Sequence, residues 1–265
     1  IYGSCGLCMC EVDGNPKLCK ACATEIAPGM IVNTNTDRVI ESRKTNLELL
    51  LSNHTGDCRP PCVLACPAKT DCQGYVGLIA NGEFEAALEL VKDKIPLPAA
   101  LGRVCPHPCE EACRRGLVDE PISIQQLKRF VADQDLDGDR FIPECDEDTG
   151  KSVAIIGGGP MGLSAAYFLR QMGHRGTVFE AMPKAGGMLR YGIPEYRLPK
   201  AVLDEEIATI EMMGVEIITN TKIGEDIPFE TIKADFDAVL LGIGAWVSTG
   251  VGCKGEDAEG VIGGI

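Results

Sequence analysis

Two runs of closely spaced cysteines are the residues of this chain best suited to chemistry. The first run consists of Cys58, Cys62, Cys66 and, slightly further on, Cys72. The second run has the same four-residue spacing, with Cys105, Cys109 and Cys113. Thiolates are soft ligands that suit iron, and short spacing lets one loop surround a cluster. The two runs therefore predict two 4Fe–4S clusters, here called cubanes.

A glycine-rich loop further along the chain has the pattern of a dinucleotide site. Gly157, Gly159 and Gly162 lie between segment 152–156, which predicts a strand, and segment 161–172, which predicts a helix. In such a loop the first glycine permits a tight turn and the second lets the backbone approach a pyrophosphate. The third lets the helix pack against the strand, and the N–H groups at the helix start face the phosphates.

The segment after this helix supports the same interpretation. A strand is predicted at 177–180, and Glu180 at its end is placed to accept a hydrogen bond from a ribose hydroxyl. The alternative is an ordinary glycine turn in an α/β protein, and the strand–loop–helix–strand order argues against it. The loop alone does not distinguish FAD from NAD. Clusters and a dinucleotide fold in one chain indicate electron transfer.

Composition narrows the class of protein. The chain has 265 residues, of which 45% are hydrophobic, so it can build two or three domains without disulfides. Its fourteen cysteines predict thiolate ligands in a reducing cytoplasm, because disulfide-rich scaffolds are small and secreted. A net charge of −14 argues against a nucleic-acid partner. No apolar run reaches the ~18 residues of a membrane span.

The pattern of the chain changes three times. Residues 1–45 predict short strands and turns, residues 46–132 predict helices, and residues 133–150 read as a solvated acidic linker. Residues 151–265 alternate strands with helices, which indicates a mainly parallel sheet. The helices expected before the linker are 46–52, 83–94 and 124–132. Beyond the elements named above, a helix is expected at 200–213 and strands at 215–220 and 238–241.

Segment 184–199 carries a resemblance to a known family. It reads Lys-Ala-Gly-Gly-Met-Leu-Arg-Tyr-Gly-Ile-Pro-Glu-Tyr-Arg-Leu-Pro and resembles the small subunit of glutamate synthase and its relatives. The resemblance implies FAD in this half of the fold, a second flavin-contacting turn in segment 237–245, and an NAD(P)H domain downstream. It implies cofactor contacts at Gly157, Gly159, Pro160, Met161, Gly162, Glu180, Gly186, Gly187, Arg190, Arg197 and Gly244.

The resemblance extends back through segment 58–132, which is similar to the two-cluster helical domain of the same family. In that domain each cluster takes ligands from both cysteine runs. By position, one cubane would take Cys58, Cys62 and Cys113, and the other would take Cys66, Cys105 and Cys109.

Each cubane then lacks a fourth ligand. For the first, His54 is favoured, because segment 53–58 is similar to a cluster-binding segment of the large iron–sulfur subunit of complex I. The alternative is a histidine stabilised by a helix dipole. For the second, Cys72 is favoured over Glu110, although Cys72 could be a small buried hydrophobe and Glu110 a surface acid. Lys128 stands about where dihydropyrimidine dehydrogenase uses glutamine as a ligand.

The first residues of the chain predict a third cluster. Cys5, Cys8 and Cys22 resemble three of the four ligands in the 2Fe–2S domain of complex I-type and iron-hydrogenase subunits. The fourth would lie upstream of this sequence. Cys10 and Cys19 are expected to be ordinary cysteines, although the Cys-x-x-Cys spacing of Cys19 and Cys22 keeps Cys19 as an alternative ligand. A structural zinc site is the rival interpretation.

These observations predict a multidomain electron-transfer flavoprotein that is one part of a longer protein. Its parts would be a partial ferredoxin-like β domain, an α-helical two-cubane domain and an α/β Rossmann-type FAD domain, incomplete at its C-terminus. Its expected partners are ferredoxin or other redox subunits, and NAD(P)H through the downstream domain. Two alternatives remain: a glutamate-synthase-type reductase, or a non-catalytic wiring subunit. No acid–base catalytic residues are predicted.

Overall fold

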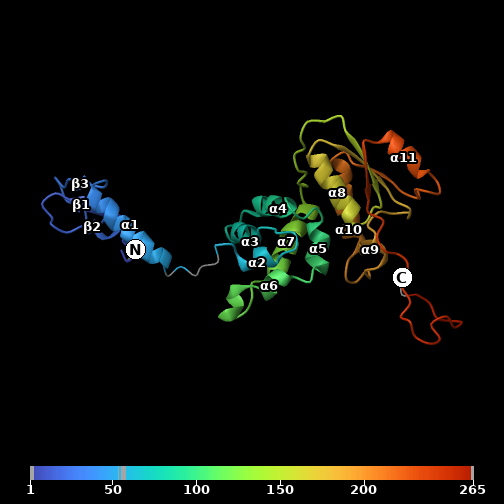
Figure 1. Ribbon diagram of the computed structural model, residues 1–265, viewed down its shortest axis with the longest axis horizontal. Helices are drawn as coiled ribbons and strands as arrows, with labels where there is room; N and C mark the ends of the chain where they lie inside the picture. The colour runs from blue at the N-terminus through green and yellow to red at the C-terminus, as the bar shows by residue number, and fades with distance from the viewer. Residues whose placement is uncertain (1–2, 53, 55–57, 264–265) are drawn as a thin grey trace. The chain divides into compact units, whose positions relative to one another are not determined.

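The computed structural model describes residues 3–52, 54 and 58–263 of the chain (Figure 1). It divides into two compact units, Ile1–Cys58 and Arg59–Ile265, and each is described by itself. Asn53 and Asp57, which belong to the segment that resembles complex I, lie outside the described residues.

The first unit is a small antiparallel sheet with one helix. Strand order is β2-β1-β3, where the strands are β1 Met9–Val12, β2 Cys19–Lys20 and β3 Val32–Asn33. A 3-10 turn, η1 Ala21–Ala23, follows β2. Helix α1, Asp37–Ser52, is hydrogen-bonded to this sheet, because the Arg43 guanidinium donates twice to the Met9 carbonyl, at 3.0 and 2.6 Å. Asn46 Nδ2 also donates to the Gly6 carbonyl at 3.0 Å.

Helix α1 runs Asp37–Ser52, so the helix expected at 46–52 begins much earlier. Its start has a local cause. The Thr36 hydroxyl accepts a hydrogen bond from the Val39 N–H at 3.3 Å, and Asp37 places a negative charge in the first turn. Both features stabilise a helix N-terminus.

The second unit begins with a helical layer. Its elements are α2 Pro61–Ala65, α3 Cys72–Ala80, α4 Phe84–Lys92, α5 Pro98–Val104, α6 Pro108–Glu111, η2 Arg114–Leu117 and α7 Ile124–Asp137. The helix expected at 83–94 is α4, and the one expected at 124–132 is α7. Their apolar faces form one core with Tyr75, Leu88, Val91, Ile124 and Val131.

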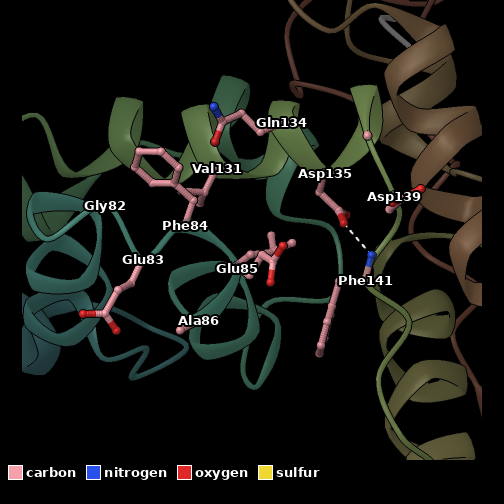
Figure 2. A pocket seen from close by; sticks show the side chains of 12 residues that line it. Gly82, Glu83, Phe84, Glu85, Ala86, Val131, Gln134, Asp135, Asp139 and Phe141 are labelled. Carbon is pink, nitrogen blue, oxygen red and sulfur yellow. Dashed lines mark hydrogen bonds between the residues drawn. The ribbon is translucent and has the colours of Figure 1, made fainter.

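Helix α7 extends into the segment that composition predicts to be a solvated linker. Asp135 is buried there, and its Oδ2 accepts a hydrogen bond from Lys92 Nζ at 2.6 Å. Its Oδ1 accepts one from the Phe141 N–H at 2.6 Å, as Figure 2 shows beside a cavity of about 800 Å³. Asp135 therefore stabilises the helical layer, because a buried carboxylate is stable only when paired.

The rest of the second unit is a parallel sheet in the order β6-β5-β4-β7. The strands are β4 Ser152–Ile156, β5 Arg175–Phe179, β6 Glu216–Ile218 and β7 Ala238–Leu241. The helices are α8 Pro160–Gln171, α9 Met188–Tyr191, α10 Lys200–Met212 and α11 Phe229–Asp235. The four strands, α8 and α10 match the expected elements to within a few residues, whereas α9 and α11 were not predicted. Residues 242–263 that follow are turns and irregular structure.

Helices cover both faces of this sheet, so it has three layers (Figure 1). Ile155 and Val178 point to the face covered by α8 and α10, and pack in the larger core. Their neighbours Ala154 and Phe179 point to the opposite face and pack with Ile232 of α11. This alternation follows from the two-residue period of a strand. None of the described helices is long and apolar enough to cross a membrane.

Helix α5 joins the helical layer to the sheet layer. Glu206 of α10 accepts hydrogen bonds from the N–H groups of Ala99 and Ala100, at 2.5 and 2.9 Å. Leu97 and Ala100 also belong to the core of the sheet layer. A second polar link is the Tyr167 hydroxyl of α8, which donates to the Lys92 carbonyl at 3.2 Å. The helical layer and the sheet thus form one packed body.

The Glu206 link gives a pH-dependent prediction. Burial raises the pKa of Glu206 from its ordinary 4.5 to about 7, although the two backbone N–H groups oppose this. Its contribution to stability is therefore complete below pH 4.5 and is lost as the pH rises through 7. Between pH 5 and 8 the wild-type chain should lose about 3 kcal/mol relative to Glu206→Gln, at about 1.4 kcal/mol per pKa unit. Urea unfolding of both proteins across this range would measure it, and a constant difference would contradict it.

Candidate cluster and nucleotide sites

The glycine-rich loop connects β4 to α8, and two of its glycines are required by the chain itself. Gly157 has φ of +108°, and a Cβ there would lie 2.3 Å from the Gly242 carbonyl oxygen. A Cβ on Gly162 would lie 1.9 Å from the Gly157 carbonyl oxygen. Both contacts are with backbone, which cannot move aside. These positions therefore fix the turn and the close approach of α8 to the strand, as expected.

Gly159 differs from these two glycines. Its φ is −78°, which any residue adopts, and a Cβ there would meet only the Gly187 Cα atom, at 3.8 Å. Nothing within the described protein excludes a side chain at this position. A glycine here is explained if a ligand approaches the backbone at the start of α8, where Pro160 and Met161 begin the helix. The loop therefore fits a bound pyrophosphate.

Glu180 lies directly after β5, as predicted, and it orders the loop. It is 7% exposed. Its Oε2 accepts from the Gly158 N–H at 2.8 Å, and its Oε1 accepts from the Met182 N–H at 2.8 Å. Each carboxylate oxygen has a second lone pair, so a further hydrogen bond from a ribose remains possible. The ribose contact stays a prediction.

The segment that carries the family resemblance folds back onto the loop. The Gly186 N–H donates to the Gly158 carbonyl at 2.7 Å, and the Gly187 backbone lies against Gly159. Gly244 follows β7, with φ of +67°, and lies near Trp246. The structure thus brings the first loop and the segment at 186–187 together.

The two predicted arginines have different surroundings. Arg190 has a side chain that is only 8% exposed and donates to the Ala185 carbonyl at 2.5 Å and to the Asp204 carboxylate. It therefore holds its own segment together, a role that the sequence does not indicate. Arg197 is exposed. A flavin contact by either residue remains a prediction.

Four of the predicted cluster cysteines meet in the helical layer. Cys72 and Cys109 are buried in its core, and Cys62 and Cys66 pack against that core. The Cys72 thiol donates to Cys109 and lowers the pKa of Cys109 to about 7, while its own pKa is raised mainly by this hydrogen bond. Burial also raises the pKa of Cys62. Cys72 lies near Cys109 and Cys66, but Cys62, assigned to the first cubane, packs against the same core, so the division of ligands between the two cubanes stays a prediction.

The second cysteine run is held against the start of α7. Gln125 Nε2 donates to the Cys105 carbonyl at 2.9 Å, and the Cys105 sulfur accepts from the His107 N–H at 3.4 Å. Glu110 Oε1 accepts from the Gln125 N–H at 2.8 Å, which caps α7. Glu110 is therefore more than a surface acid, because it fixes the cysteine run to this helix.

No three histidine, cysteine or acidic side chains converge on a single point in the described part of the chain. A cubane does not require such convergence, because each of its protein ligands binds a different iron around an inorganic core. Cys62, Cys66, Cys72 and Cys109 lie in or against one core of the helical layer, and their soft sulfur donors suit iron. The residues present therefore fit a cluster.

In the first unit, Cys8 and Cys22 lie close together. Their sulfur atoms are 3.2 Å apart, and Cys5 interacts with Cys22 electrostatically. Two thiolates on one tetrahedral metal lie about 3.8 Å apart, given a metal–sulfur distance of about 2.3 Å. Cys8 and Cys22 lie near each other but closer than this distance, so their ligation of one metal stays a prediction. Cys10 is buried, and Cys19 accepts a hydrogen bond from Asn15, as expected of ordinary cysteines.

His54 lies just beyond the end of α1. Its N–H donates to the Leu51 carbonyl at 3.1 Å, and its Nε2 lies 3.2 Å from the Cys58 sulfur. This contact is a hydrogen bond, and the nitrogen and sulfur atoms would have to separate to bind different irons of one cubane. Ligation by His54 stays a prediction.

Comparison with known proteins agrees with these sites. Residues 1–37 match the 2Fe-2S iron-sulfur cluster binding domain, and residues 34–139 match dihydropyrimidine dehydrogenase domain II, 4Fe-4S cluster. Residues 155–204 match the NAD(P)-binding Rossmann-like domain.

Relatives that match about three quarters of the chain are also redox proteins by name. The chain is 45% identical over 74% of its length to the NADP(+)-dependent formate dehydrogenase subunit beta of Moorella thermoacetica. It is 44% identical over 74% to the NADPH-Fe(3+) oxidoreductase subunit beta of Geobacter sulfurreducens. It is 38% identical over 74% to the glutamate synthase [NADPH] small chain of Bacillus subtilis. The chain spans 31%, 30% and 40% of these three relatives, respectively.

The glycine-rich loop gives a prediction at Gly159. Gly159→Val should leave the fold intact, because a Cβ there makes only an ordinary contact with Gly187 Cα at 3.8 Å, but it should block the approach of a dinucleotide. We expect an unchanged melting temperature and unchanged iron content with loss of bound flavin, measured by absorbance of the purified protein. Gly162→Val, which strikes backbone, should instead disrupt the fold. Stoichiometric flavin in Gly159→Val would show that the dinucleotide binds elsewhere.

The His54 prediction is tested through a cluster potential. An imidazole is neutral where a thiolate is anionic, so His54→Cys should keep the cluster and lower its potential. His54→Ala should leave a labile iron that is lost on purification. Redox titration followed by electron paramagnetic resonance would measure both, with His174→Ala as the matched control. An unchanged signal and midpoint in His54→Ala would show that His54 is only a helix-end residue.

Proposed function

We propose that this chain is the flavin- and cluster-binding part of a multi-subunit oxidoreductase that moves electrons between a pyridine nucleotide and iron–sulfur clusters. One observation carries the proposal. The glycine-rich loop, the second cysteine run and all of the first run except Cys58 lie in the same unit, and α5, which ends one residue before Cys105, is anchored by Glu206 of the nucleotide-binding part. Electron transfer needs its carriers at fixed, short separations, and one packed body supplies them.

The chain's own residues would have distinct roles. Gly157 and Gly162 shape the loop, Gly159 admits the pyrophosphate, and Glu180 orders the loop and accepts from the ribose. FAD, when bound, exchanges electron pairs with a nicotinamide and single electrons with clusters. Gly244, with the 186–197 segment, would complete the flavin site.

The cysteines would divide as the family resemblance implies. One cubane would use Cys58, Cys62 and Cys113 with His54. The other would use Cys66, Cys105, Cys109 and Cys72. The 2Fe–2S cluster would use Cys5, Cys8, Cys22 and a further thiolate upstream.

The proposed domains are a ferredoxin-like β domain at 1–45, a bis-4Fe–4S domain that begins at 46 and includes α7 to Asp137, a linker in the remainder of 133–150, and an FAD domain from 151. An NAD(P)H domain would follow, and the protein would act in the cytoplasm with ferredoxin or other redox subunits. The relatives named as beta subunits of a formate dehydrogenase and of an NADPH-Fe(3+) oxidoreductase support such an assembly.

A second candidate is a reductase of the glutamate synthase type. It is favoured by the similarity to the glutamate synthase [NADPH] small chain, and it shares the same flavin and cubanes. Activity with a separate amidotransferase subunit would distinguish it from the first. A non-catalytic wiring subunit would contain flavin and clusters but would not oxidise NAD(P)H even as the full-length protein.

Metal analysis tests the proposal. An anaerobic preparation of the chain should contain about eight iron and eight sulfide from the two cubanes, before any 2Fe–2S contribution. Replacing Cys109 with alanine should remove about half of this iron, whereas Cys145→Ala, outside both runs, should remove none. Zinc with little iron would overturn the proposal.

A further inference from the structure

Lys128 is a cation buried in the face of α7 that packs into the helical layer. It is 5% exposed, and it lies in a stripe of buried residues at helical spacing. The stripe consists of Ile124, Gln125, Lys128, Val131, Ala132 and Asp135. Gln125 lies about one turn earlier. Its side chain donates to the Cys105 carbonyl, and its N–H donates to the Glu110 carboxylate, so this end of the stripe contacts the second cysteine run.

Lys128 differs from the other buried lysine of this layer. Lys92 is paired with Asp135 at 2.6 Å and donates to the Phe141 carbonyl. Within residues 3–52, 54 and 58–263, no carboxylate lies within ion-pair distance of Lys128 and no acceptor lies within hydrogen-bond distance. Every fully enclosed side-chain nitrogen or oxygen in these residues has a partner, so the Lys128 ammonium keeps a small opening.

A nearly buried ammonium without a partner costs several kcal/mol. A nearby negative charge offsets that cost. Cys109 is buried in the same core and lies on α6, which contacts α7. The Cys72 hydrogen bond lowers the pKa of Cys109 most, and the Lys128 charge adds to this lowering. Lys128 therefore lies near the cysteine run and whatever that run binds.

We propose that Lys128 is a positioning residue whose fixed positive charge raises the reduction potential of the cubane held by Cys109. The proposal rests on the proposed function, because it requires the cubane. A reduced cluster carries one more negative charge than an oxidised one, so a neighbouring cation stabilises the reduced form. The low polarity of the surrounding core strengthens this attraction. The lysine thus makes this cubane a better electron acceptor than it would be without the charge.

Four variants of the intact protein, prepared anaerobically, test the proposal. Lys128→Met and Lys128→Gln remove the charge, Lys128→Arg keeps it, and Lys94→Met removes an exposed charge from the same layer. The readouts are iron content and the midpoint potentials of both cubanes, from redox titration followed by electron paramagnetic resonance.

We expect Lys128→Met to retain its iron and to shift one midpoint to a more negative potential, with a smaller shift in the other. Lys128→Arg and Lys94→Met should keep both midpoints. An unchanged or more positive midpoint in Lys128→Met would overturn the proposal. Iron loss in both Lys128→Met and Lys128→Gln would also overturn it, because the lysine would then serve assembly. A wild-type protein without iron would instead contradict the proposed function.

Discussion

The buried carboxylate of Glu206 is the contact on which the arrangement of the second unit depends. Two N–H groups at the start of α5 have no partner within the helix, and Glu206 satisfies both from the nucleotide-binding part. The other end of α5 is capped by Cys105. A seven-residue helix therefore connects the layer that packs on the sheet with a predicted cluster ligand.

Close packing makes this connection rigid. A Cβ on Gly102 of α5 would lie 2.8 Å from the Arg129 Cα atom of α7, so the two helices touch at their backbones. The Arg103 guanidinium pairs with the Asp133 carboxylate at 2.7 Å beside this contact. Helix α7 in turn holds the second cysteine run through Gln125. The nucleotide loop and the cysteines are thus linked by helices that have little freedom to shift, as electron transfer requires.

Local pattern was sufficient to predict the sheet, the loop at Gly157 and the helix that follows it, because strand and helix periods and glycine spacing are local signals. The early start of α1 could also have been found, from Thr36 and Asp37 as cap and first-turn residues. The burial of Asp135 could not have been predicted, because its partner Lys92 is distant in the sequence and an acidic composition predicts a solvated segment.

The same limit applies to the sites. Cys72 and Cys109 lie close together because α3 and α6 both pack against α7, and the spacing of the cysteines in the sequence does not predict that packing. The capping role of Glu110 and the internal role of Arg190 are also tertiary, since each depends on a partner from another segment.

The central claim is that one body holds a flavin and cubanes close enough to exchange electrons. Photoreduction of the bound flavin in the anaerobic chain, followed by rapid freezing and electron paramagnetic resonance, tests this most directly. The account predicts that reduced-cubane signals appear within milliseconds as the flavin is reoxidised. Flavin that stays reduced while the cubanes remain oxidised, although both are chemically reducible, would contradict it.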